Sequence, residues 1–94
     1  MLNAAFIERQ RVRLLRRREL YAVEIRREEL PAAMRTHKAR VLREIIPMVL
    51  SHIKYGTYGL CVECGEEILQ RRLELVPTAL RCVTCQSQVD EEGP

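Results

Sequence analysis

Two Cys-x-x-Cys pairs constrain the fold of this chain more than any other feature. Cys61 and Cys64 form the first pair, Cys82 and Cys85 form the second, and Gly65 directly follows the first. Each pair spans one tight turn, so both of its sulfurs can reach one metal ion at about 2.3 Å, and the intervening chain can double back to complete a tetrahedron. A glycine after the pair suits a turn that needs a positive φ. Since all 4 cysteines of the chain belong to this pattern, the spacing predicts one zinc ion held by four thiolates.

Two other uses of cysteine are disfavoured. Disulfides belong to exported proteins, and residues 1–7 run directly into Glu8 and Arg9 without the apolar core or the cleavage site of a secretory leader. A redox-active Cys-x-x-Cys pair is normally single and lies in a βαβ pattern, which this sequence lacks. With four protein ligands, the predicted site keeps no position for water or substrate. We therefore expect a structural zinc, no catalytic residues and no enzymatic activity.

Length and composition fit this interpretation. A chain of 94 residues allows one small domain, or a small domain with a helical extension, and a core of that size is marginal unless a metal stabilises it. Hydrophobic residues make up 47% and charged residues 31% of the chain, as in ordinary soluble proteins. No apolar run approaches the roughly 20 residues that span a bilayer. We expect a cytoplasmic protein that does not bind membranes.

Charge divides the chain in two. Residues 1–50 carry 12 Arg or Lys against 6 Glu, whereas residues 51–94 carry 4 basic against 7 acidic side chains. The two parts therefore have local charges of +6 and −3, within a formal net charge of +3 for the whole chain. This pattern indicates a basic extension joined to an acidic finger.

Residues 1–55 are predicted to form a helical hairpin. Between Leu2 and Leu30 the sequence has no Gly or Pro, and strong helix formers dominate it. Apolar residues of this first segment recur at sevens: Ile7, Leu14 and Tyr21, with Ile25 on the same face. The second segment carries a similar stripe: Met34, Val41, Met48 and Tyr55, with Ile45 and His52 between them. Two heptad-spaced stripes in one short chain favour an antiparallel pair of helices.

Pro31 marks the break between the two predicted helices. Proline disfavours helical backbone at Leu30 and suits the first position of a new helix. One long helix kinked at Pro31 is the alternative, because no Gly, Asn or Asp lies nearby. Pro47 lies inside the second helix, where it lacks an amide and crowds the carbonyl of Arg43, so it should bend that helix. Other apolar side chains of the second helix would pack on the finger or on a partner: Leu42, Ile46, Val49, Leu50 and Ile53.

Residues 56–94 are predicted to form the zinc-finger domain. The second helix ends near Lys54, and Gly56 and Gly59 supply the turn into the finger. Further elements are expected in this order: short strands at 58–60 and 67–69, a short helical turn at 71–75, and a last helix from Cys82 to about Glu91. The predicted fold class is therefore mainly α, with an N-terminal helical hairpin followed by a small four-cysteine zinc finger, short strands and a C-terminal helix.

The finger sequence resembles a known family. Two segments carry the likeness: residues 56–68, GTYGLCVECGEEI, and residues 71–86, RRLELVPTALRCVTCQ. They are similar to the DksA/TraR family of bacterial zinc-finger proteins in the cysteine spacing, the GTYG lead-in, the Arg-Leu pair and the Pro-Thr-Ala segment. The resemblance implies that the zinc ligands are Cys61, Cys64, Cys82 and Cys85.

The resemblance also implies regulation of transcription without DNA binding. Members of this family insert a helical part into the secondary channel of bacterial RNA polymerase, and some act together with the alarmone ppGpp. Bacterial RNA polymerase is then the expected partner, and the helical hairpin is the arm that enters the channel. Two positions depart from the family pattern. The expected tip around Glu28 and Glu29 has no aspartate, and Val76 stands where alarmone-responsive members have a basic residue, so neither tip aspartates nor an alarmone site is expected here.

Two other functions are kept as alternatives. The arginine-rich run from Arg9 to Arg18 would attract phosphates, which favours direct nucleic-acid binding. Its arginines spread around the helix, however, and the chain has only 3 Tyr and 1 Phe for stacking on bases. The other alternative is a helical module that pairs with another protein or with a second copy. His37 and His52 are further metal-ligand candidates, although the four-cysteine set is already complete.

Overall fold

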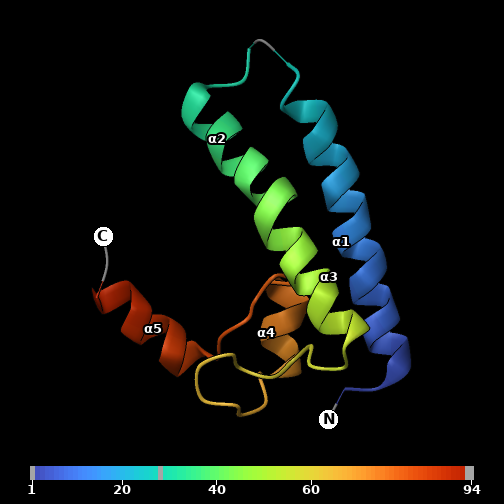
Figure 1. Cartoon of the computed structure of the whole chain (residues 1–94), viewed down its shortest axis with the longest axis vertical. Helices are drawn as coiled ribbons and strands as arrows, with labels where there is room; N and C mark the ends of the chain where they lie inside the picture. The colour runs from blue at the N-terminus through green and yellow to red at the C-terminus, as the bar shows by residue number, and fades with distance from the viewer. Residues whose placement is uncertain (1, 28, 93–94) are drawn as a thin grey trace.

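The computed structural model describes residues 2–27 and 29–92, and this part of the chain is mainly helical (Figure 1). Its elements are α1 (Ala4–Glu24), α2 (Ala32–Arg40), the π-helical segment η1 (Val41–Ile45), α3 (Ile46–Lys54), α4 (Gln70–Leu75) and α5 (Val83–Glu92). Helix α1 packs antiparallel against the continuous run of α2, η1 and α3. The finger lies where α1 begins and α3 ends, and the hairpin turn lies at the opposite end of the molecule (Figure 1). The predicted mainly α fold and the helical hairpin are confirmed.

Helix α1 is shorter at both ends than the stretch without Gly or Pro, residues 2–30. It begins after Asn3, whose side-chain Oδ1 accepts a hydrogen bond from the amide of Phe6 at 2.8 Å. Beyond its end at Glu24, the amides of residues 26 and 27 bond to carbonyls three residues back, at 3.2 and 3.1 Å. This tighter pattern is the 3₁₀ geometry that commonly closes a helix.

A turn separates the two helices of the hairpin. Pro31 has extended backbone, with φ −56° and ψ 143°, and its carbonyl accepts the first helical hydrogen bond, from the amide of Arg35 at 2.9 Å. Proline therefore stands just before α2 instead of at its first position, and one continuous helix through residue 31 is not formed. Glu28, one of the two predicted tip glutamates, lies outside the described residues.

Pro47 follows a π-helical segment that accommodates it. The amide of Ile46 bonds to the carbonyl of Val41, five residues back, instead of the usual four. In a regular α-helix the ring of Pro47 would crowd the carbonyl of Arg43 and leave it without a donor. The wider π turn gives this carbonyl room, and Pro47 then stands in the first turn of α3, where its missing amide costs little.

The π-helical segment also moves the buried face of the second helix. Of the stripe predicted there, Val41 is buried, and Ile45 and His52 are partly buried. The other three side chains are exposed: Met34 (47%), Met48 (52%) and Tyr55 (71%). The buried face contains Val41, Ile46 and Val49 instead. A π turn contains one residue more than an α turn. A position counted at an interval of seven through the π turn therefore lies about 100° around the helix axis from the packed face. The predicted stripe is therefore confirmed at Val41 and Ile45 and wrong at Met48 and Tyr55, while Ile46 and Val49 pack within the chain.

The predicted stripe on α1 is confirmed in part. Leu14 is fully buried, and Ile7 and Tyr21 are partly buried against the core. Phe6 and Gln10 are buried as well, although the heptad pattern did not include them. Residues 6, 10 and 14 follow one another at intervals of four, which is the spacing of one α-helical face. Counting at fours would have found this face.

The described part of the finger contains no strand, so the prediction of short strands at 58–60 and 67–69 is wrong. One antiparallel bridge joins Leu60 and Glu67, and the amide of Ile68 donates to the carbonyl of Gly59 at 2.7 Å. The ladder stops there because Gly59 and Gly65 have φ values of 91° and 78°, which break an extended backbone on both sides of the bridge. The short helical turn and the last helix form as predicted, as α4 and α5.

Gln10 joins the hairpin to the finger through buried hydrogen bonds. Its Nε2 donates to the carbonyl of Leu73 at 2.7 Å and to the hydroxyl of Tyr58 at 3.1 Å. That hydroxyl donates to the carbonyl of Pro77 at 2.9 Å, while Oε1 of Gln10 accepts from Arg13 at 2.8 Å. Burial raises the pKa of Tyr58, so the phenol stays protonated and keeps this bond. Every polar atom of the Gln10 side chain is therefore used at the joint.

One buried cluster contains residues from both predicted segments, from Phe6 in α1 to Cys85 in α5. The division into a hairpin domain, residues 1–55, and a finger domain, residues 56–94, is a statement about independent folding. It stays a prediction.

Replacing Gln10 with Leu should destabilise the zinc-loaded chain by about 1–3 kcal/mol, because the buried carbonyl of Leu73 and hydroxyl of Tyr58 then lose their donor. Urea unfolding followed by circular dichroism measures this change. Gln70→Leu is the matched control, since Gln70 is exposed and its replacement should change the stability by less than about 0.5 kcal/mol. Equal effects of the two substitutions would show that the buried network contributes nothing.

Candidate metal centre

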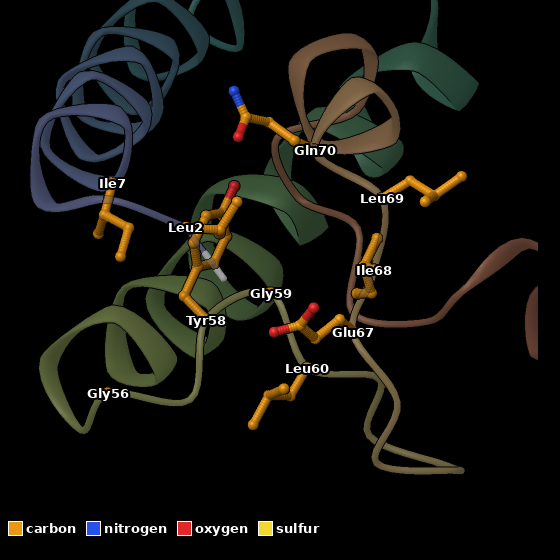
Figure 2. A pocket seen from close by; sticks show the side chains of 10 residues that line it. All are labelled: Leu2, Ile7, Gly56, Tyr58, Gly59, Leu60, Glu67, Ile68, Leu69 and Gln70. Carbon is orange, nitrogen blue, oxygen red and sulfur yellow. The ribbon is translucent and has the colours of Figure 1, made fainter.

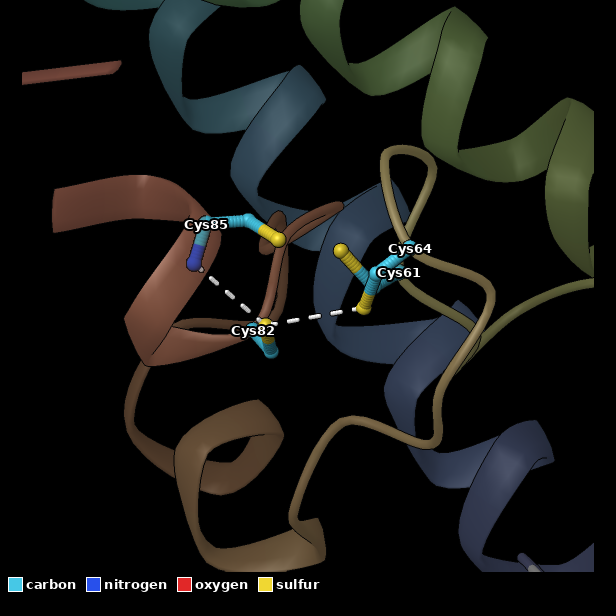
Figure 3. Close-up of side chains that lie close together, drawn as sticks. All are labelled: Cys61, Cys64, Cys82 and Cys85. Atoms are coloured by element: carbon cyan, nitrogen blue, oxygen red, sulfur yellow. Dashed lines mark hydrogen bonds between the residues drawn. The ribbon is translucent and has the colours of Figure 1, made fainter. Parts of the chain in front are cut away.

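The structure brings the four cysteines together from two segments of the finger (Figure 3). Cys61 and Cys64 lie on the loop after α3, while Cys82 and Cys85 lie at the start of α5. All four Sγ atoms lie within 4.8 Å of one another, and those of Cys64 and Cys82 are 3.9 Å apart. Four sulfurs at about 2.3 Å from one tetrahedral zinc would be about 3.8 Å apart. The arrangement therefore fits one zinc ion.

The first cysteine pair is held by a tight turn. The amide of Gly65 donates to the carbonyl of Cys61 at 2.9 Å, and the amide of Cys61 donates to the carbonyl of Glu66 at 2.8 Å. Gly65 has the positive φ that the sequence predicted for it, 78°, which a side chain would strain. The amide of Val62 donates to the carbonyl of Leu80 at 2.9 Å. This last bond ties the first pair to the chain that leads into the second pair.

The second cysteine pair uses the first turn of α5. Cys82 directly precedes the helix, its Sγ accepts the amide of Cys85 at 3.4 Å, and its carbonyl accepts the amide of Gln86 at 2.9 Å. The sulfur of Cys82 thus accepts a hydrogen bond from one of the amides that have no backbone partner in the first turn of a helix. Arg81 reaches back to Glu63 of the first pair, with a nitrogen–oxygen distance of 3.2 Å. Interactions outside the sulfur cluster therefore fix the position of the first cysteine pair relative to the second.

The protonation state of the four cysteines depends on whether a metal ion is bound. Hydrogen bonds from the amides of Cys64 and Cys82 lower the pKa of Cys61 to about 6. The side-chain hydrogen bond with Cys82, together with burial, raises the pKa of Cys85 to about 12. Without a metal ion the cluster therefore holds Cys61 as a thiolate and Cys85 as a thiol at neutral pH. Four thiolates this close together need a bound dication to offset their charge.

Zinc affinity should fall by at least about tenfold for each pH unit below 8, because the metal must displace the proton of Cys85. The sign for Cys61 agrees: its pKa is lowered on folding, so its contribution to stability is present above its ordinary pKa of 9.0 and is lost as the pH falls through about 6. Competition with a chromophoric chelator at pH 6, 7 and 8 measures the slope. An affinity that stays constant over this range would contradict the assignment of a protonated Cys85.

Coordination by all four sulfurs would leave a bound metal no open position for water or substrate. All four tetrahedral positions belong to the protein, and soft thiolates select zinc over magnesium or calcium. Neither predicted histidine joins the cluster among the described residues. His52 lies in α3, where its Nδ1 is 2.7 Å from the hydroxyl oxygen of Thr57. The site therefore fits one structural zinc, with no histidine ligand.

A second feature near the finger is a hollow of about 280 Å³ at the joint with the hairpin (Figure 2). Leu2 and Ile7 line it from the start of α1, and residues 58–60 and 67–70 line it from the finger. Leu2 comes so close that a Cβ on Gly59 would lie 2.7 Å from its Cδ1. No cysteine lines this hollow, so it is separate from the metal centre and belongs to the hairpin–finger packing.

Sequence reasoning located the four cysteines and missed the residues that place them. Gln10 is the main omission, because a polar side chain was not sought on a packing face. Its position four residues after Phe6 and four before Leu14 was the available signal.

Within the described residues, every helix is too short or too polar to cross a lipid bilayer.

The finger is similar to a known family of zinc fingers. The profile of the prokaryotic dksA/traR C4-type zinc finger matches residues 56–90. The RNA polymerase-binding transcription factor DksA of Haemophilus influenzae is 38% identical over 61 residues, which cover 64% of this chain and 42% of that protein. The chain spans between 32% and 45% of the length of the curated relatives it matches.

Two solved structures share the whole fold. One is the RNA polymerase binding protein and transcriptional regulator Dks of Chlamydia trachomatis, with a TM-score of 0.76 and 26% identity over 98% of this chain and 95% of that one. The other is transcription factor DksA2 of Pseudomonas aeruginosa, with a TM-score of 0.69 and 27% identity over 96% and 87%. The likeness therefore includes the hairpin as well as the finger.

Proposed function

We propose that this chain, whose residues 56–90 form a zinc finger of the prokaryotic DksA/TraR family, is a transcription regulator that binds bacterial RNA polymerase. On this proposal the helical hairpin is the arm that enters the secondary channel, and the finger docks at the channel rim. The observation that carries the proposal is the fold shared with an RNA polymerase-binding protein over nearly the full length of both chains. The protein would act in the bacterial cytoplasm and would catalyse no reaction itself.

The metal would have a structural role in this function. We assign one zinc ion to Cys61, Cys64, Cys82 and Cys85, on the strength of their mutual distances and of the finger family. Zinc bound there would fix the loop after α3 against α5 and so complete the finger. The joint through Gln10, Tyr58 and Leu73 would then hold the finger at a defined angle to the hairpin.

The shape of the molecule supports an arm that enters a channel. The chain measures 42 × 34 × 20 Å along its principal axes, and the run from α2 to α3, residues 32–54, is about 34 Å long at 1.5 Å per residue. Near the turn, Lys38 of α2 pairs with Glu24 of α1 and lies 4.9 Å from the centre of the Tyr21 ring. This contact between the two helices keeps the far end of the arm closed and stiff.

The far end of the arm is basic, which separates this chain from members with aspartates at the tip. Glu29 is exposed there, but the surrounding side chains are mostly cationic: Arg26, Arg27, Arg35, Lys38 and Arg40. Val76, at the position discussed above for the alarmone, is 40% exposed and carries no charge. We therefore propose polymerase binding without an alarmone site and without acidic tip chemistry.

Direct binding of nucleic acid is the weaker alternative. Three of the arginines in the basic run already have partners: Arg11 pairs with Glu8 at 2.6 Å, Arg13 donates to Gln10 at 2.8 Å, and Arg9 lies 5.9 Å from the ring centre of Phe6. These contacts use the guanidinium groups that a phosphate stripe would need free. A helical module that pairs with an unrelated protein is less favoured, because it would not account for the shared fold.

A pull-down with purified bacterial RNA polymerase tests the proposal. We expect the zinc-loaded chain to bind polymerase and to be displaced by a known secondary-channel protein added in excess, because the two would occupy the same channel. Random DNA duplexes should bind at most weakly, with an affinity that falls steeply as salt rises. Polymerase binding that the competitor leaves unchanged would contradict the channel, and tight DNA binding at physiological salt would favour the alternative.

A further inference from the structure

A second hollow lies near the far end of the arm, away from the metal centre. It has a volume of about 390 Å³ and is lined by Ile25 at the end of α1, by Arg35, Thr36 and Ala39 of α2, and by Arg43 of η1. Two arginines thus line one hollow, together with one threonine and two apolar residues. None of the described residues that line it is acidic.

The guanidinium of Arg35 is fixed on one side and unpaired on the other. One terminal nitrogen, Nη2, donates to the carbonyl of Arg27 at 2.5 Å, which anchors the side chain across the hairpin turn. Its Nε is buried and has no hydrogen-bond partner among the described residues. Leaving such a donor unsatisfied is unfavourable, so the described chain leaves part of the Arg35 guanidinium uncompensated.

The positive charge of Arg43 is likewise not offset by a carboxylate of the described residues. It is exposed and forms no ion pair within residues 2–27 and 29–92. Its neighbours differ: Arg40 pairs with Glu44 at 3.3 Å, and Lys38 pairs with Glu24. The two arginines that line the hollow are therefore those of α2 and η1 that no carboxylate neutralises. Mutual repulsion of their charges falls when an anion lies between them.

We propose that this hollow is a binding site for a phosphate chain, a diphosphate or longer, held by Arg35 and Arg43. A guanidinium presents planar pairs of donors that match phosphate oxygens, and the hydroxyl of Thr36 supplies one more donor. Arg35 and Arg43 stand eight residues apart, about 12 Å along a helix, so an elongated anion spans them better than a single phosphate. Ile25 and Ala39 offer apolar contact to any organic part of the ligand. The proposal goes beyond polymerase binding and does not depend on it.

Titration of the free zinc-loaded chain with diphosphate at fixed ionic strength tests the site, with calorimetry for affinity and the Arg35 Nε–H signal in nuclear magnetic resonance for location. We expect saturable binding of one diphosphate and a shift of that signal. Arg35→Gln and Arg43→Gln should each weaken binding at least tenfold, and Arg35→Lys should weaken it too because lysine lacks Nε and the planar fork. Ala39→Leu should weaken binding by filling the hollow at unchanged charge.

Arg40→Gln is the matched control. It removes the same charge from the same helix, but Arg40 does not line the hollow, so the affinity should change less than about twofold. A loss as large as that of Arg43→Gln would show diffuse attraction by the basic arm and would overturn the site. The site would also be overturned if Ala39→Leu left the affinity unchanged or if no binding were seen at millimolar diphosphate. Orthophosphate or citrate that bound as tightly as diphosphate would overturn it too.

Two further measurements keep the outcome clear. Arg43→Gln breaks no hydrogen bond or ion pair of the described chain, so its effect stands even if Arg35→Gln loosens the turn, and circular dichroism and zinc content check both variants. ATP that binds as tightly as diphosphate assigns the site to the phosphate chain alone, whereas tighter binding adds the nucleoside as a contact of the apolar wall. Because the free chain is titrated, failure of this site leaves polymerase binding standing, and the reverse holds as well.

Discussion

Removal of zinc should unfold the finger while the hairpin keeps part of its helix. A closed thiolate site contributes on the order of 10 kcal/mol, which equals or exceeds the whole stability of a small domain. The described part of the finger, residues 56–92, contains one bridge and two short helices, and it has little else to replace the metal. A strong chelator, or Cys64→Ser, should therefore abolish the ordered finger. Circular dichroism should retain the part of the signal that comes from α1 and from α2 to α3.

Val62→Ser is the matched control for this experiment. Val62 lies between the two cysteines of the first pair, is 45% exposed, and receives the same new side chain without loss of a ligand. Its zinc content and unfolding midpoint should stay close to those of the parent. A folded finger without stoichiometric zinc, or a Cys64→Ser chain as stable as Val62→Ser, would contradict the structural role of the metal.

The parts of the fold that follow from local chemistry could be predicted from the sequence. The cysteine spacing and the positive φ of Gly65 each depend on a few neighbouring residues, and both are found in the structure. The end of the second helix before Gly56 is equally local. For such features, the residue type and its immediate neighbours fix the backbone.

The failures of prediction come from features that shift the register. A heptad assumes a constant number of residues per turn, and Pro47 breaks this assumption by inducing a π turn at Val41–Ile45. Met48 then leaves the packed face and Ile46 enters it. In the finger, residues 58–60 and 67–69 flank the first cysteine pair and were expected to pair as strands, but the positive φ of Gly59 interrupts the extended backbone. In each case one proline or glycine outweighs the pattern around it.

The joint between hairpin and finger could not be predicted, because its partners are far apart in the sequence. Gln10 lies 63 residues from Leu73 and 48 from Tyr58. A single sequence indicates that Leu73 is apolar, but not which surface covers it. The structure places it under Gly59, where a Cβ would lie 3.7 Å from its Cδ1. Leu73 is therefore one of the fully buried residues whose loss should destabilise the chain.

Leu73→Ala should cost about 2–5 kcal/mol of stability, the usual range for truncating a fully buried leucine. The side chain is 0% exposed, and the carbonyl of the same residue accepts from Gln10, so the cavity would open beside the buried network. Urea unfolding of the zinc-loaded chain measures the loss, with circular dichroism for the helices and a zinc indicator for the finger.

Leu75→Ala is the control, because Leu75 lies two residues further along α4 and is 72% exposed. It makes the same chemical change in the same short helix, and should alter stability by less than about 0.5 kcal/mol. Equal effects of the two substitutions would show that burial at the joint does not stabilise the chain.

The circular dichroism and zinc-indicator signals of Leu73→Ala also test the division of the chain at residue 55. If Leu73→Ala moves zinc release to lower urea and leaves the helical transition in place, residues 56–94 unfold as a separate domain. If both transitions move together, the joint makes hairpin and finger one cooperative unit, since a cavity in the finger then also weakens the helices of the hairpin.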